Sequence, residues 1–191
     1  MNDGVVDAAF TPAEALAGVA PDCPRSVLDS LTLLRVSYPH EDGRCHEGQI
    51  VVHRALVGDV ERVFEVIREI GMPIGSVIPM AAKQFALDGA WSDDLSMAAN
   101  NSSGFNYRRI AGTDRWSAHA FGTAVDLNPR WNPMLSAGRV YPPNGTYDPQ
   151  RPGTFTAGHP VVLEFERMGW QWGGRWKSPV DLHHFEKRSS A

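Results

Sequence analysis

Hydrophobic positions alternate, or recur at helical spacing, along the first third of the chain. Alternation over residues 31–38 predicts a β-strand, and the turn-forming Glu41-Asp42-Gly43 separates it from a partner strand over 49–54. Hydrophobic residues spaced by three and four between 59 and 70 predict an amphipathic α-helix that ends at Gly71. The residues expected on its buried face are Val60, Val63, Phe64, Ile67 and Ile70.

The pattern is weaker in the rest of the chain. We expect a short strand at 77–80, a polar loop at 100–104, a strand at 124–127, a second amphipathic helix at 159–168 and a final strand at 182–186. Val162, Phe165 and Met168 form the expected inner face of the second helix. Prolines and glycines without periodicity fill 129–158, which predicts a long surface insertion.

Length and composition favour one α+β domain. The chain has 191 residues, of which 42% are hydrophobic and 21% charged, and these fractions exclude a disordered or coiled-coil chain. Scattered prolines and alanines near the start predict an N-terminal arm over residues 1–29 that holds one short helical turn. The remaining residues, 30–191, form the predicted domain.

Charge and cysteine content exclude several classes of partner. The net charge of −4 gives no bulk attraction to nucleic acid or to an anionic membrane, and no apolar stretch is long enough to span a membrane. The acidic first residues do not resemble a signal peptide. Cys23 and Cys45 cannot form a four-thiolate zinc site, and the sequence leaves their pairing open.

Two segments are dense in imidazole and carboxylate groups. Residues 117–126 read Ser-Ala-His-Ala-Phe-Gly-Thr-Ala-Val-Asp, and residues 181–186 read Asp-Leu-His-His-Phe-Glu. Nitrogen and oxygen ligands of this kind suit zinc, and a catalytic zinc takes three protein ligands and leaves a position for water. His119, Asp126 and one of the tandem histidines, His183 or His184, supply such a set.

The spacing of His119 and Asp126 requires a turn between them. Gly122 and Pro129 argue against a helix there, and on a continuous strand a separation of seven puts two side chains on opposite faces. We therefore expect a turn at Gly122. The chain must also bend between Asp181 and His184 if these two side chains are to face one another.

A metal-dependent hydrolase also needs groups that move protons and stabilise negative charge. Asp181, three residues before His184, is a candidate general base and acid, although it could instead orient a ligand histidine. Arg108 is a candidate for stabilising a developing oxyanion. Ser117 could donate a hydrogen bond to substrate. A structural hydrogen bond explains Glu186 at least as well as a substrate role does. We assign no role to His40, His46, His53 or His159.

The two motifs together resemble a known family. Ser-x-His-x-x-Gly-x-Ala-x-Asp followed by Asp-x-x-His-Phe-Glu resembles the zinc D-alanyl-D-alanine carboxypeptidases, which include VanY-like enzymes and L-alanyl-D-glutamate endopeptidases. Residues 103–108 (Ser-Gly-Phe-Asn-Tyr-Arg) and 169–176 (Gly-Trp-Gln-Trp-Gly-Gly-Arg-Trp) also resemble segments of this family, so that the resemblance covers roughly residues 30–187.

The resemblance implies roles for individual residues. It implies His119, Asp126 and His184 as zinc ligands, Asp181 as the catalytic carboxylate and Arg108 as the group that polarises the scissile carbonyl or anchors substrate. Ser117 becomes a weaker substrate contact, and His183 occupies a position that the family leaves variable. Aspartate at position 181 resembles the endopeptidase and VanY-like members, whereas the dipeptidase branch has glutamate there.

The expectation is a compact α+β zinc peptidase with a small antiparallel sheet flanked by helices and zinc in a surface cleft. The resemblance implies that it hydrolyses amide bonds in peptidoglycan stem peptides, either as a D,D-carboxypeptidase or as an L-Ala-D-Glu type endopeptidase. We expect a monomer that acts at the bacterial cell wall, secreted or released in the manner of a phage lysin. The alternative is a zinc-stabilised, non-catalytic module that binds the cell wall.

Overall fold

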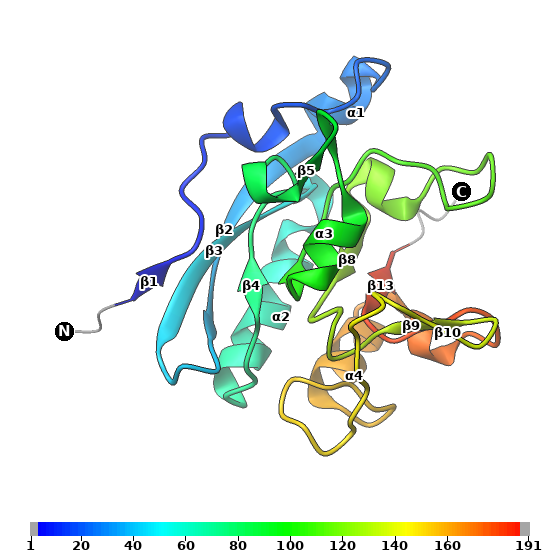
Figure 1. Cartoon of the computed structure of the whole chain (residues 1–191). Helices are drawn as coiled ribbons and strands as arrows, with labels where there is room; N and C mark the ends of the chain where they lie inside the picture. Colours follow the sequence, from blue (N-terminus) through cyan, green and yellow to red (C-terminus); the bar gives the residue numbers. More distant parts are fainter. Residues whose placement is uncertain (1–3, 188–191) are drawn as a thin grey trace.

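The computed structural model describes residues 4–187, which fold into a mixed arrangement of helices and small sheets (Figure 1). The α-helices of this part are α1 (Arg25–Ser30), α2 (Val57–Glu69), α3 (Asp93–Ala98) and α4 (Pro160–Arg167). The longer strands are β2 (Leu31–Pro39) and β3 (Cys45–His53). Strands of two or three residues are β1 (Val5–Val6), β4 (Ser76–Val77), β5 (Ala86–Leu87), β6 (Ala90–Trp91), β7 (Asn101–Ser102), β8 (Ala124–Asp126), β9 (Met134–Ser136), β10 (Arg139–Tyr141), β11 (Gln171–Trp172), β12 (Val180–Asp181) and β13 (His184–Glu186). The prediction of a mixed α+β chain is confirmed, with the strands distributed over several small sheets.

The β2–β3 hairpin and α2 form the first half of the core. The two strands pair antiparallel along their whole length, from Leu31 opposite His53 to Pro39 opposite Cys45. Helix α2 packs on this hairpin with the predicted residues Val60, Val63, Phe64 and Ile67 buried. The expectation that Ile70 is buried on the same face is wrong, because Ile70 follows the last turn of the helix and is 43% exposed.

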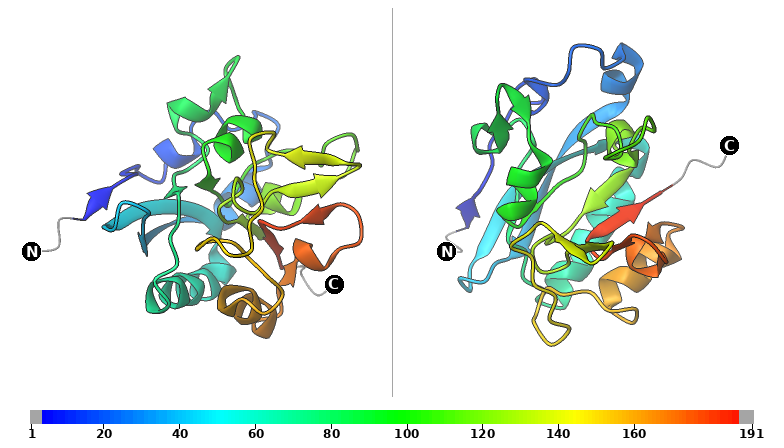
Figure 2. Two further views of the ribbon diagram at one scale, coloured as in Figure 1. Left: turned by 60° about the horizontal axis from the view of Figure 1, so that its bottom comes forward. Right: turned by 45° about the vertical axis from the view of Figure 1, so that its right-hand side comes forward.

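The second half of the core is a three-stranded antiparallel sheet covered by α4. Its strand order is β11-β13-β8, and α4 lies beside α2 on the same side of the molecule (Figure 2). Phe165 of α4 stacks on Phe185 of β13 with ring centroids 4.2 Å apart, and both rings are fully buried. Phe155 meets the edge of Phe185 at 5.3 Å. The hydrophobic core therefore lies directly beneath β13.

The expectation of a surface insertion over residues 129–158 is confirmed for its middle, which is largely exposed, but is wrong for its two ends, which are buried. The segment contains β9 and β10, and β9 pairs with β12 near the end of the chain. Trp131 and Phe155 are buried. The side chain of Asn132, fully buried, donates to the carbonyl oxygen of Gly153 and accepts from the amide of Phe155, so its polar groups are satisfied inside the fold.

Two further expectations change. Residues 100–104, expected as a polar loop, are buried and include β7, because the Asn101 side chain bonds both the amide and the carbonyl of Ile78. The N-terminal arm contributes β1, which runs parallel to β3, as well as the 3₁₀ turn η1 (Glu14–Leu16). The boundary between residues 29 and 30 stays a prediction.

Cys23 and Cys45 are both free thiols. Among residues 4–187, no helix combines the length and the apolar composition that crossing a membrane requires.

Replacing Phe165 with alanine tests the importance of the ring stack on Phe185. We expect a loss of about 3–5 kcal/mol in the free energy of unfolding, since the change leaves a cavity where a fully buried ring packed. Leu163→Ala is the matched control, because Leu163 is in the same helix but 48% exposed, and we expect it to change stability by less than about 0.5 kcal/mol. Urea unfolding of both variants measures the difference; equal losses would show that the core does not depend on this stack.

Candidate metal centre

His119 is positioned by a single 3₁₀ turn that ends in a left-handed glycine. The turn η4 (Ala118–Phe121) begins at Ser117, whose hydroxyl accepts a hydrogen bond from the amide of His119 at 3.3 Å. Gly122 ends it with φ +66°, and a Cβ at this position would lie 2.6 Å from the side chain of Leu31 and 2.7 Å from the backbone nitrogen of His53. Only glycine fits there without strain. The predicted turn at Gly122 is confirmed, and it directs the chain from His119 back into β8.

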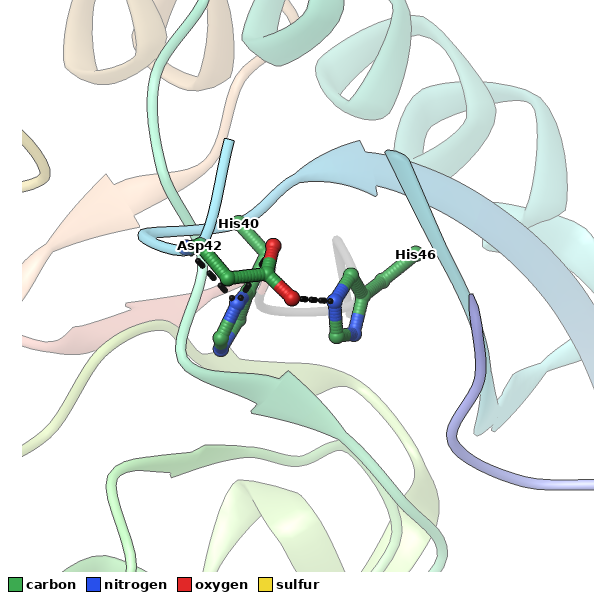
Figure 3. A group of neighbouring side chains, drawn as sticks. All are labelled: His40, Asp42 and His46. Atoms are coloured by element: carbon green, nitrogen blue, oxygen red, sulfur yellow. Dashed lines mark hydrogen bonds and ion pairs between the residues drawn. The ribbon is translucent and has the colours of Figure 1, made fainter. Parts of the chain in front are cut away.

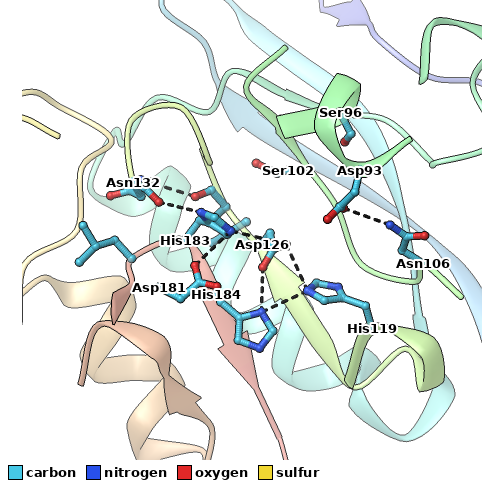
Figure 4. A network of polar contacts seen from close by, with 12 residues as sticks. Asp93, Ser96, Ser102, Asn106, His119, Asp126, Asn132, Asp181, His183 and His184 are labelled. Carbon is cyan, nitrogen blue, oxygen red and sulfur yellow. Dashed lines mark hydrogen bonds and ion pairs between the residues drawn. The ribbon is translucent and has the colours of Figure 1, made fainter. Parts of the chain in front are cut away.

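Strand pairing brings Asp126 and His184 together. Asp126 ends β8, and His184 begins β13 directly opposite it in the antiparallel register. His119 Nε2 lies 3.1 Å from Asp126 Oδ2, His184 Nδ1 lies 3.0 Å from Asp126 Oδ1, and the two ring nitrogens are 3.1 Å apart (Figure 4). The three residues form a group whose ligand atoms all lie within 4.8 Å of one another.

Hydrogen bonds outside the group orient both imidazoles. His119 Nδ1 lies 2.6 Å from the carbonyl oxygen of Gly104, which can only accept, so Nδ1 carries a proton and Nε2 is directed at Asp126. His184 Nε2 lies 3.3 Å from Glu186 Oε2, so its Nδ1 turns toward the same point. Ligand histidines in metalloproteins are typically held by such bonds from the other ring nitrogen.

The buried group is strongly polarised. Burial opposes the charged form of Asp126, but His119, His183 and His184 outweigh it and hold the pKa of this carboxyl well below its usual range. Burial also opposes the charged form of His184, but Asp126 and Glu186 raise its pKa above the ordinary value.

Asp181 lies beside this group and contacts the second of the tandem histidines. Its Oδ1 is 3.1 Å from His183 Nε2, but the approach does not meet hydrogen-bond geometry, so Oδ1 is a buried oxygen with no hydrogen-bond partner in residues 4–187. His183 Nδ1 lies 2.8 Å from the carbonyl oxygen of Asn132, which fixes the ring. His183 Nε2 is 4.0 Å from Asp126 Oδ2, so His183 borders the group that His184 completes.

Arg108 and Ser117 are not part of the group of ligand atoms. The guanidinium of Arg108 pairs with Asp93, from Nη2 to Oδ2 at 2.7 Å, and the other oxygen of Asp93 accepts from Asn106 Nδ2 at 3.0 Å. Asn106 in turn donates its backbone amide to the carbonyl of His119 at 3.1 Å. Ser117 is 5% exposed and caps η4.

The structure therefore brings His119, Asp126 and His184 into one group, with Asp181 at its border. Three polar residues near them were not predicted from the sequence: Asp93, Asn106 and Asn132. Each acts through a contact that joins distant parts of the chain, and no local pattern of residues marks such a contact. The sequence does point to His183, since it directly precedes His184, a candidate ligand.

Comparisons with known proteins bear on the segment that holds this group. Residues 111–187 match the family model described as D-alanyl-D-alanine carboxypeptidase. Searches among curated proteins and among solved structures gave no match. The matched segment is less than half of the chain, but it contains His119, Asp126, Asp181 and His184. Residues 111–187 are therefore similar to the D-alanyl-D-alanine carboxypeptidase family, which supports the resemblance that the two motifs indicate.

Proposed function

We propose that this protein is a zinc metallopeptidase that hydrolyses amide bonds in peptidoglycan stem peptides. The observation that carries the proposal is the convergence of His119 Nε2, a carboxylate oxygen of Asp126 and His184 Nδ1. The family match over residues 111–187 supports the peptidase class.

The donor set fits zinc. Two imidazole nitrogens and one carboxylate oxygen form a typical set of three protein ligands for a catalytic zinc. Both rings are already held by outer hydrogen bonds with a nitrogen directed to the common point. When bound, zinc supplies a Lewis acid that polarises a carbonyl and lowers the pKa of water.

Asp181 is the residue that we assign to proton transfer. Its carboxylate is placed close to the metal group by β12 and carries a buried oxygen with no hydrogen-bond partner in the described part of the chain. A carboxylate in this position can accept a proton from the attacking water and deliver it to the leaving amine. His183, held by the Asn132 carbonyl, lies beside this carboxylate with its Nε2 3.1 Å from Oδ1.

Arg108 is proposed to bind the substrate carbonyl or carboxylate. Asp93 holds one edge of its guanidinium, while the Nε group is buried and has no hydrogen-bond partner among residues 4–187. A guanidinium held in this way keeps a donor for an oxyanion. Ser117 remains a proposed secondary contact, although its hydroxyl oxygen already accepts the amide of His119.

The finer assignments belong to this proposal. We propose that zinc lies in a surface cleft, that the protein works as a monomer at the bacterial cell wall, secreted or released as phage lysins are, and that it cleaves either the terminal D-alanine or an internal stem-peptide bond. Aspartate at position 181 favours the endopeptidase or VanY-like type. A non-catalytic wall-binding module is the other candidate, and the orphaned carboxylate oxygen of Asp181 argues against it.

Mass spectrometry of products from purified peptidoglycan tests the function. We expect zinc-loaded protein to release a new product, and we expect chelated protein and His119→Ala to release none. The matched control is His53→Asn, which removes an imidazole elsewhere and keeps an acceptor for the amide of Ala55.

The products also separate the alternatives. Free D-alanine identifies the carboxypeptidase, and an amide-blocked C-terminus should then stop the reaction, whereas new internal amines identify the endopeptidase. Zinc-loaded protein that binds peptidoglycan from several wall types but never cleaves it would contradict the enzyme and favour the binding module.

Asp181→Ala tests the proton-transfer role. We expect kcat to fall by about 10²- to 10⁴-fold, the usual contribution of a general acid or base, while one zinc per catalytic group stays bound. Asp114→Asn, at an exposed aspartate of the same matched segment, should keep full activity. Wild-type activity in Asp181→Ala would show that another group moves the proton.

Zinc affinity should depend on pH through His184. Because Asp126 and Glu186 raise the pKa of this imidazole, it is protonated at neutral pH in the metal-free protein, and zinc must displace that proton. Apparent affinity should therefore rise with pH, by about tenfold per unit when one proton is released. Competition with a chromogenic chelator between acidic and mildly alkaline pH measures the slope, and a flat profile would mean that the free ring is neutral.

A further inference from the structure

A second group of imidazole and carboxylate side chains lies at the turn between β2 and β3. His40 and Asp42 are in the turn, and His46 follows in β3 (Figure 3). Asp42 contacts both rings: its Oδ1 is 3.1 Å from His40 Nδ1, and its Oδ2 is 3.1 Å from His46 Nε2. One ligand atom from each residue lies within 4.8 Å of the others. Figures 1 and 2 place this turn away from β8 and β13.

His46 is oriented in the way that a metal ligand requires. Its Nδ1 lies 3.0 Å from both carboxylate oxygens of Asp7, and Tyr38 donates its hydroxyl proton to the same carboxylate. Asp7 thus accepts the proton of Nδ1 and Asp42 that of Nε2, so a divalent ion at this point would replace the Nε2 proton. A carboxylate behind a ligand imidazole is a common outer contact of metal sites.

His40 also presents an electron-rich nitrogen to Asp42. The backbone amide of Asp42 donates to His40 Nδ1 at 3.2 Å, so this nitrogen acts as an acceptor. An acceptor nitrogen and a carboxylate oxygen only 3.1 Å apart repel one another; the Arg44 guanidinium offsets part of this repulsion, and a divalent ion bound to both atoms would remove it. The rings of His40 and His46 are stacked with centroids 4.0 Å apart, which keeps both on one side of Asp42.

Solvent can reach the group from one side. The side chain of His46 is 7% exposed, whereas those of His40 and Asp42 are 25% and 27% exposed. An ion could therefore enter through the turn and keep water as a further ligand. Arg44 pairs with Asp42, with Nη2 2.6 Å and Nε 2.8 Å from Oδ2.

We propose that His40, Asp42 and His46 bind a second zinc-class divalent ion, with Asp7 positioning His46. A set of two imidazoles and one carboxylate binds zinc-class ions in preference to calcium or magnesium, which favour oxygen ligands. The ion links the turn to the N-terminal arm, since Asp7 follows β1 and contacts His46 directly. The inference concerns a site separate from the proposed peptidase centre and does not depend on its activity.

Zinc stoichiometry tests the proposal directly. Metal analysis after equilibrium dialysis against zinc should find two ions per wild-type chain, one in His40→Ala and one in His119→Ala. His53→Asn, which removes another imidazole of β3, should still bind two. His40→Ala should keep wild-type peptidase activity, because His40 lies outside the catalytic group, so failure of this site is distinguishable from failure of the peptidase proposal.

A second variant controls for the case in which His40→Ala loses zinc only because the turn changes conformation. Arg44→Gln removes the cation that competes for Asp42, so zinc should bind the turn about two- to fivefold more tightly, the range expected from loss of an exposed ion pair. Weaker binding at the turn in Arg44→Gln, or an unchanged count of ions in His40→Ala, would overturn the proposal.

Discussion

The antiparallel register between β8 and β13 is the constraint on which the candidate metal centre depends. It sets His184 opposite Asp126 and Phe185 opposite Val125. Side chains alternate along a strand, so the two ligands share one face while Val125 and Phe185 enter the core, where both are fully buried. A shift of one residue would bury the imidazole among aromatic rings and expose Phe185. Hydrophobic packing therefore fixes the geometry of the polar site.

Buried asparagines connect the loops around the site. Asn128 donates to the carbonyls of Pro73 and Gly153 and accepts the amide of Gly75, which ties three distant segments together. Asn132 holds Gly153 through its side chain and His183 through its carbonyl oxygen. A fully satisfied buried amide specifies one arrangement of backbone, because any other leaves a donor or acceptor unpaired. The segment 129–158 is in this way part of the support for Asp181.

The sequence predicted the parts of this structure that depend on local periodicity. Strand β2, helices α2 and α4, and the turn at Gly122 follow from spacing and glycine chemistry, and the two motifs indicated His119, Asp126 and His184. Strands β1, β7 and β12 are only two residues long, so they show no alternation, and tertiary hydrogen bonds decide where they pair. For the same reason the contacts of Arg108 with Asp93, and of His46 with Asp7, could not be derived from the sequence.

The distance along the chain between Asp126 and His184 has a consequence for biosynthesis. These residues are 58 positions apart, and the intervening chain must fold back before β13 can join β8. During vectorial synthesis the first two donors emerge together, while the third arrives only after α4 has been made. The three candidate donor atoms therefore converge only when β13 joins β8, after α4 has been made.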